Sequence, residues 1–166
     1  MATVNVALSA AQTVTITLAS LATSSTYLSG RESNEIDNTS TLYVDAILEG
    51  FVTVGTTPTA NTSINIYVWG SHTAASSVNV DALDGVDSAE TITTRDAYLK
   101  LVSVIYVDST TSDRKYNFNA GGIAAYFGGS MPRYWGVYVA HNTGVNLNAT
   151  SGNHEIKYTG VTYTVA

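Results

Sequence analysis

The chain has 166 residues, which suits one domain, and its hydrophobic content of 45% excludes a generally disordered protein. The net charge is −6 and the seven basic residues are scattered, which argues against direct binding to nucleic acid. Cysteine is absent, which excludes disulfides and thiolate chemistry. The sequence shows neither a basic, apolar leader at its start nor the ~20 consecutive apolar residues of a membrane-spanning helix.

Alternation of apolar and polar residues predicts β-strands along most of the chain. Residues 1–12 stand outside the clean alternation, so we expect either an N-terminal arm ordered by a neighbouring subunit or an edge strand of the same domain. Residues 13–19 are predicted as a strand and residues 20–40 as a loop. The longest predicted strand spans 41–54, and its expected core face carries Leu42, Val44, Ala46, Leu48, Val52 and Val54.

A turn containing Gly, Pro and Asn precedes a predicted strand over residues 63–69. Its expected core face carries Ile64, Ile66 and Val68, while Tyr67 and Trp69 lie on the opposite face. Further along the chain we expect a connection over 70–95, strands over 97–107, 115–119, 133–140 and 154–164, and a short helical turn over 123–127.

About eight strands joined by loops of unequal length favour an all-β fold, a two-sheet antiparallel sandwich with jelly-roll topology. A closed barrel is the alternative arrangement. We find no internal repeat and no linker, so residues 13–166 are predicted to form a single β-sandwich domain.

The sequence offers few of the residue patterns that enzymes use. His72, His141 and His154 are dispersed without the close spacing of a metal-binding pair. A Gly-x-Ser-x-Gly elbow is absent from the sequence, and Asp45 and Glu49, the best pair of carboxylates for glycoside hydrolysis, read more simply as a solvated face. We therefore expect a protein without enzymatic activity, catalytic residues or a cofactor.

One acidic stretch is a weak candidate for a metal site. Asp81, Asp84 and Asp87 recur every third residue around Gly85, and calcium prefers clustered carboxylate and carbonyl oxygens on a loop. The spacing differs from that of an EF-hand, which places its acids at every second position. A solvated acidic loop is the simpler interpretation.

Aromatic residues carry the strongest binding signal in the sequence. Tyr67, Trp69, Tyr134 and Tyr138 lie on predicted strands, and an exposed row of them could stack on sugar rings or fill pockets of a partner. The alternative is that Trp69 and Trp135 pack in the core.

Three stretches together resemble a known group of proteins. The first is Gly30-Arg-Glu-Ser33 running into Asp37-Asn-Thr-Ser40, and the second is Thr56-Thr-Pro-Thr-Ala-Asn61 leading to Ile64-Asn-Ile-Tyr-Val-Trp-Gly70. The third is Met131-Pro-Arg-Tyr-Trp-Gly-Val-Tyr-Val139. With most of residues 28–160, they resemble the small β-sandwich virion proteins of tailed bacteriophages, in particular capsid decoration or cement proteins.

The resemblance implies a structural protein of a phage particle, made in the cytoplasm of the bacterial host and placed on the capsid exterior. Its partners would be the major capsid protein, copies of itself in a homo-oligomer, or both. The motif residues would then be structural, with Arg31 pairing an acid and Trp packing the core. The alternatives are a carbohydrate-binding module on a tail or fibre, or another virion part such as a connector or tail protein.

Overall fold

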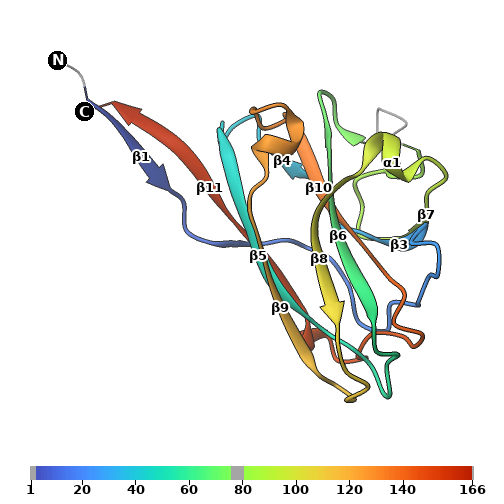
Figure 1. Cartoon of the computed structure of the whole chain (residues 1–166). Helices are drawn as coiled ribbons and strands as arrows, with labels where there is room; N and C mark the ends of the chain where they lie inside the picture. The colour runs from blue at the N-terminus through green and yellow to red at the C-terminus, as the bar shows by residue number, and fades with distance from the viewer. Residues whose placement is uncertain (1–2, 76–80, 166) are drawn as a thin grey trace.

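In the computed structural model, which describes residues 3–75 and 81–165, two antiparallel sheets pack face to face (Figure 1). Sheet A has five strands, in the order β1 (Val4–Leu8), β11 (Glu155–Val165), β5 (Asp45–Thr53) and β9 (Lys115–Gly122), with β2 (Gln12–Thr13) also pairing with β11. Sheet B has six, in the order β7 (Ala89–Thr91), β3 (Ser29–Glu32), β10 (Tyr134–His141), β6 (Thr62–Ser71) and β8 (Lys100–Val107), with β4 (Ile36–Asp37) also pairing with β10.

The strand order is that of a jelly roll. From β3 onward the chain passes repeatedly between the sheets, so that β11 lies between β1 and β5 in sheet A, and β10 lies between β3 and β6 in sheet B. The described residues also contain the short helices α1 (Arg95–Tyr98), η2 (Ala124–Phe127) and η3 (Ser151–Asn153). The all-β two-sheet sandwich is confirmed, and η2 matches the predicted helical turn at 123–127.

The main core lies between the sheets and includes most of the predicted core residues. Leu48, Val52, Ile64, Ile66 and Val68 are fully buried. The prediction is wrong for Leu42, which is 70% exposed, and Val44 is only half-buried. Leu42 has a positive φ of 51° in a turn where the Asn38 carbonyl accepts its N–H and the Asn38 side chain accepts the N–H of Tyr43, so β5 begins only at Asp45.

The strand predicted over 13–19 is also wrong beyond Thr13. The Val14 N–H donates to Ile156 of β11, but the next carbonyl, that of Thr15, accepts the N–H of Asn34 beside sheet B. This segment therefore crosses from one sheet to the other, and it fills the space between them with the buried side chains of Val14 and Leu18. The apolar and polar residues alternate here because one side of the crossing segment faces the core and the other side faces solvent.

The loop predicted over residues 20–40 contains β3 and β4, which both pair with β10. Propensity gave no sign of these strands, because Arg31 and Glu32 are charged and the neighbouring residues are polar. The side chains of Arg31 and Glu32 form hydrogen bonds with residues more than fifty positions later in the sequence, in the stretch around Asp87. These hydrogen bonds offset the cost of placing charged side chains in a sheet.

The central strands β6 and β10 of sheet B are buried on both faces, whereas the outer side of β8 is exposed. The outer face of β6 and β10 is covered by the connection that follows β6 and carries β7 and α1; residues 76–80 of this connection lie outside the described residues. A second hydrophobic cluster forms beneath this cover, consisting of Tyr67, Trp69, Ala75, Leu83, Ile92, Leu99, Tyr138 and Ala140.

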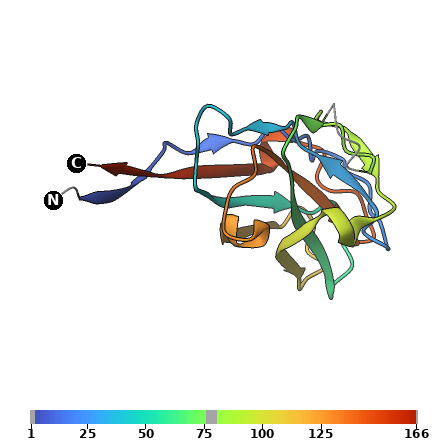
Figure 2. The same cartoon turned by 90° about the horizontal axis from the view of Figure 1, so that it is seen from above.

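The two ends of the described chain form a projecting ribbon. β1 pairs with β11 of the same chain, from Val4 opposite Val165 to Leu8 opposite Val161, and the pair extends away from the body of the sandwich (Figures 1 and 2). In the segment 1–12, predicted as an arm or an edge strand, Val4–Leu8 thus form an edge strand of sheet A within the same chain, while residues 1–2 lie outside the described residues. Among the described residues, no helix has the length and apolarity needed to cross a membrane.

We expect Ile66→Ala to lower the free energy of unfolding by about 2–5 kcal/mol, because the side chain is fully buried between the sheets and its loss leaves a cavity. Val104→Ala is the matched control, since Val104 lies on the adjacent strand β8 and is 55% exposed. Urea unfolding followed by circular dichroism measures both. A loss below about 0.5 kcal/mol for Ile66→Ala, the range of ordinary surface changes, contradicts the assigned core.

Candidate interaction surface

The ribbon of β1 and the end of β11 has one continuous apolar face. In an antiparallel pair, residues opposite each other point to the same side. The register places Val4 opposite Val165, Val6 opposite Tyr163 and Leu8 opposite Val161. All six side chains are therefore on one side, and five of them are between 61% and 72% exposed: Val4, Val6, Leu8, Tyr163 and Val165.

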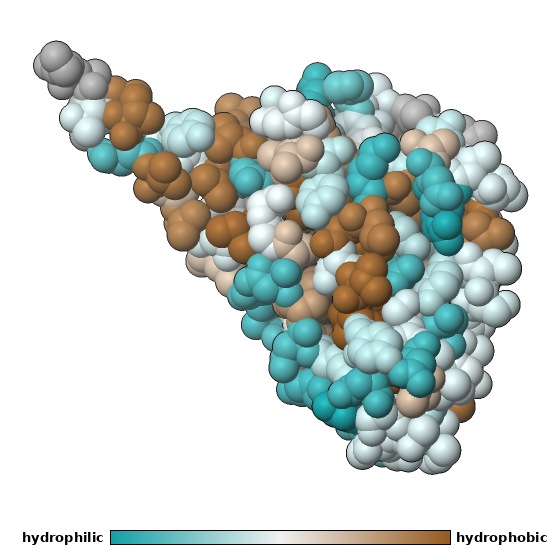
Figure 3. Space-filling view, viewed as in Figure 1, coloured by the Kyte–Doolittle hydropathy of each residue, from teal (hydrophilic) through white to brown (hydrophobic). Residues whose placement is uncertain are grey.

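The other face of the ribbon is polar or small, with Asn5, Ala7, Thr162 and Thr164. The ribbon is thus amphipathic, with the pattern of a strand pair that covers a core on one side. Its apolar side has no cover within the described chain, as the exposure of these five side chains shows. The other neighbour of β11 is β5, which makes its last pair between Asp45 and Val161, so beyond this point the ribbon has two strands. Figure 3 shows the hydrophobic side chains along the projecting ribbon.

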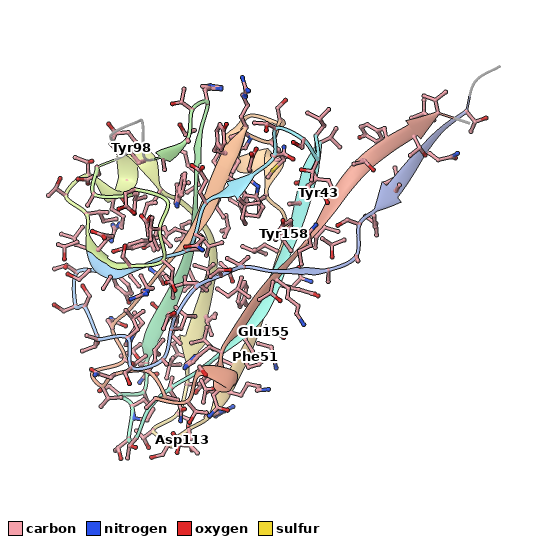
Figure 4. The ribbon with its side chains drawn as sticks, turned by 180° about the vertical axis from the view of Figure 1, so that it is seen from behind. Tyr43, Phe51, Tyr98, Asp113, Glu155 and Tyr158 are labelled. Atoms are coloured by element: carbon pink, nitrogen blue, oxygen red, sulfur yellow. The ribbon has the colours of Figure 1, made fainter. Side chains whose placement is uncertain are left out.

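The ribbon joins the body at a tightly built root. Gly160 of β11 lies against the ring of Tyr43, and a Cβ at this position would overlap that ring. The Gln12 amide donates to the Tyr43 hydroxyl at 2.9 Å, and its oxygen accepts from the Tyr158 hydroxyl at 2.9 Å. Both tyrosines lie where β5 and β11 pass each other (Figure 4). The root therefore fixes the direction in which the ribbon leaves the sandwich.

A groove of about 630 Å³ lies at this root, on the apolar side of the ribbon. The ribbon supplies one wall through Val6, Val161 and Tyr163, and the body supplies the opposite wall, which includes Tyr43 and Met131. Asp45 and Ser130 also line the groove, so the apolar side of the ribbon leads into a concave site of mixed polarity. Such a site can take up apolar side chains of a partner.

A second groove, of about 460 Å³, lies beside α1 on the outer side of sheet B. Its walls combine aromatic rings with polar groups, as sugar-binding sites do. The Arg95 guanidinium lies 6.0 Å from the centre of the Tyr67 ring, and the Asn65 amide donates to the Tyr67 hydroxyl at 3.0 Å. The remaining lining residues are Tyr27, Asp96, Leu99, Lys100, Leu101 and Tyr126.

The four aromatic residues singled out in the sequence do not form an exposed row. Tyr67 is 4% exposed, and Trp69 and Tyr138 are fully buried, because the connection after β6 covers this face of sheet B. Tyr134 is only partly exposed, at the start of β10. Tyr67 lines the groove beside α1. Trp135 is also fully buried, against Tyr158, with ring centres 5.1 Å apart.

The acidic stretch does not converge on a metal site. Asp81 accepts the N–H groups of Thr93 and Thr94, whereas Asp84 accepts the N–H of Val86. Asp87 instead pairs with Arg31, with Nε and Oδ1 2.6 Å apart. Within residues 3–75 and 81–165, no group of three or more His, Asp or Glu side chains could hold a metal ion. Each aspartate closes a loop or holds it to β3.

Glu32, which the sequence analysis did not single out, holds the cover of sheet B in place. Its side chain is fully buried, and Oε1 accepts the N–H groups of Asp84, Gly85 and Val86 at 3.2, 2.6 and 3.0 Å. Burial raises the pKa of Glu32 to about 8, against the opposing effect of these three donors. A Gly at position 85 with φ of 79° permits the turn to wrap around the carboxyl group.

His141, His154 and the candidate carboxylate pair have structural partners, whereas His72 is exposed just after β6. His141 is fully buried between Thr143 and the carbonyl of Leu21, and burial lowers its pKa to about 4. His154 contacts the carbonyl of Asn148 through Nε2, at 2.8 Å. Asp45 accepts the N–H of Ala124 at the start of η2, and Glu49 accepts from the Asn119 amide on β9.

A comparison with protein-family models and with curated proteins finds no match for this chain.

We expect the stability difference between Glu32→Gln and the wild type to depend on pH. Since the pKa of Glu32 is higher in the folded state, the folded carboxyl binds a proton that the unfolded one releases, and wild-type stability from this group falls as the pH rises from about 4.5 to 8. Gln retains an oxygen acceptor but does not titrate. Urea unfolding between pH 5 and 8 should therefore show the variant gaining relative to the wild type as the pH rises. Titration of the histidines affects both proteins equally and cancels in this difference. A stability difference that does not change with pH contradicts the raised pKa of Glu32.

Proposed function

We propose that this protein is a non-enzymatic structural protein of a phage particle, a decoration or cement protein on the capsid exterior. It stabilises the shell through contacts with capsid subunits and with copies of itself. The observation that carries the proposal is the projecting ribbon, whose apolar face is left exposed by the chain itself. An exposed apolar surface of this kind is typical of a protein–protein contact.

The fold supports the same class of function. Jelly rolls are common in viral capsid proteins and in lectins, although a fold alone does not decide between functions. The three stretches that carry the phage resemblance contribute β3, β4, β6 and β10, which lie together in sheet B. Arg31 pairs with Asp87 and both tryptophans are buried, which agrees with the structural roles that the resemblance implies.

The geometry suits a cement role because the ribbon extends the reach of a small body. A contact at the end of a projecting element can bridge neighbouring subunits that the body itself does not touch. On a shell each such contact is repeated by symmetry, so moderate contacts add up to large stabilisation of the particle without any one being tight.

We expect purified particles to contain this chain in many copies, and particles that lack it to release their DNA at a lower temperature or at lower salt. Quantitative mass spectrometry gives the copy number relative to the major shell protein, and a dye-release melt gives the stability. Adding the purified wild-type chain back should restore the melt. Absence of the chain from washed particles, or an unchanged melt when it is lacking, contradicts the proposal.

A carbohydrate-binding module is the second candidate, favoured by the groove beside α1 with its tyrosines and polar groups. Tyr126 is 39% exposed at this groove, so its ring is accessible to a sugar. Under this alternative the chain would belong to a tail or fibre and would bind a glycan of the host surface.

A glycan array separates the two candidates. The cement role predicts a blank array. A specific hit that Tyr126→Ala or Arg95→Ala weakens at least about tenfold, the effect expected for a residue that carries binding energy, would favour the carbohydrate module instead. Tyr106→Ala is the matched control, since Tyr106 is an exposed tyrosine on β8 that does not line the groove.

A further inference from the structure

We infer that the apolar face of the ribbon is covered by the same face of a second copy of this chain. The face in question consists of Val4, Val6, Leu8, Val161, Tyr163 and Val165. This self-association is a property of the purified chain and does not require a phage particle.

Charge favours a second copy as the occupant. The chain carries a net charge of −6, so two copies repel each other wherever their charged surfaces meet. The paired residues of the ribbon include no Asp, Glu, Lys, Arg or His. Two copies can therefore meet along their ribbons without placing like charges together, and the projection keeps the charged bodies apart (Figures 1 and 2).

The area is also sufficient. Five side chains of this size, each about two-thirds exposed, present roughly 500 Å² of apolar surface on each copy. Two ribbons packed face to face would then bury on the order of 1,000 Å², which is the lower limit for a specific interface.

The shape is compatible with a two-fold axis through the middle of the ribbon. In a symmetric dimer the same patch serves both partners, so the face must be complementary to itself. A ribbon with branched aliphatic side chains at both ends and the Val6–Tyr163 pair between them meets this condition. Two such ribbons stack as two sheets do, with their outer faces of Asn and Thr in water.

The pairing also accounts for the stability of the ribbon. A two-stranded ribbon alone in water is marginally stable. Beyond Val161, β11 pairs with β1 on one side only, since β5 has ended. A second ribbon on the apolar face supplies the hydrophobic contact that this part of the chain lacks.

A pair of charge-matched variants tests the inference. Val6→Asp with Tyr163→Asp places two charges on the apolar face, and Asn5→Asp with Thr164→Asp places the same two charges on the opposite face of the same strands. We expect the wild type and the second variant to sediment as a dimer or larger assembly. The first variant should sediment as the 17.5 kDa monomer with unchanged circular dichroism of the body.

Cysteine cross-linking gives a second measurement on a folded protein, since the wild-type chain has no cysteine. Under mild oxidation Tyr163→Cys should form a disulfide-linked dimer, whereas Thr164→Cys, on the other face, should remain mainly monomeric. This test does not depend on the charged variant being well folded.

Three results would overturn the inference: a wild type that is monomeric at every concentration, an assembly that survives the charges on the apolar face, or equal cross-linking of the two cysteine variants. A monomer that still binds phage particles would overturn this inference and leave the proposed function standing. Conversely, a ribbon-dependent dimer that is absent from particles would leave the inference standing and contradict the proposed function.

Discussion

Strand β11 continues to Val165, although its pairing with β5 ends at Val161. The projecting ribbon of β1 and β11 depends on this difference in strand length. From Glu155 to Tyr158 its side chains alternate between the core and the outside, with Ile156 and Tyr158 buried. Beyond Val161 the neighbouring strand β5 has ended, while β11 continues to Val165 and keeps β1 as its partner. The core-facing positions of β11 are Ile156, Tyr158 and Gly160, so Val161, Tyr163 and Val165 continue the opposite, outward side of the strand. Among the described residues no element packs on this apolar side.

The root of the ribbon turns this mismatch into a defined geometry. Gln12 bridges the hydroxyl groups of Tyr43 and Tyr158, and Gly160 gives the Tyr43 ring room to lie on the strand. A protruding strand pair without such a root would move freely, and ordering it on a partner would then cost conformational entropy. Here the contacts of Gln12, Tyr43 and Tyr158 already order the root of the ribbon, so less conformational entropy is lost on docking.

Sheet B illustrates a different constraint, the burial of both faces of its central strands β6 and β10. The inner face packs against sheet A, and the outer face places Trp69 and Tyr138 beneath the connection that carries β7 and α1. Glu32 holds this cover by accepting three backbone N–H groups, and Arg31 holds it through Asp87. The aromatic residues with the strongest binding signal in the sequence are therefore mostly core residues, and the exposed surfaces suited to a partner lie elsewhere.

The sequence by itself determined the all-β class, the jelly-roll sandwich, most of the strands and the inner face of β6, because a period of two in side-chain polarity is a local property. It could not reveal β3, whose charged residues are stabilised by partners more than fifty positions away, or the crossover after Thr13, whose alternation resembles that of a strand. The apolar alternation of Val4, Val6 and Leu8 and that of Val161, Tyr163 and Val165 are both visible in the sequence. Only the tertiary structure decided that they pair in a register that places all six on one side, and that no other element within residues 3–75 and 81–165 covers them, because register and cover depend on contacts between residues far apart in the sequence.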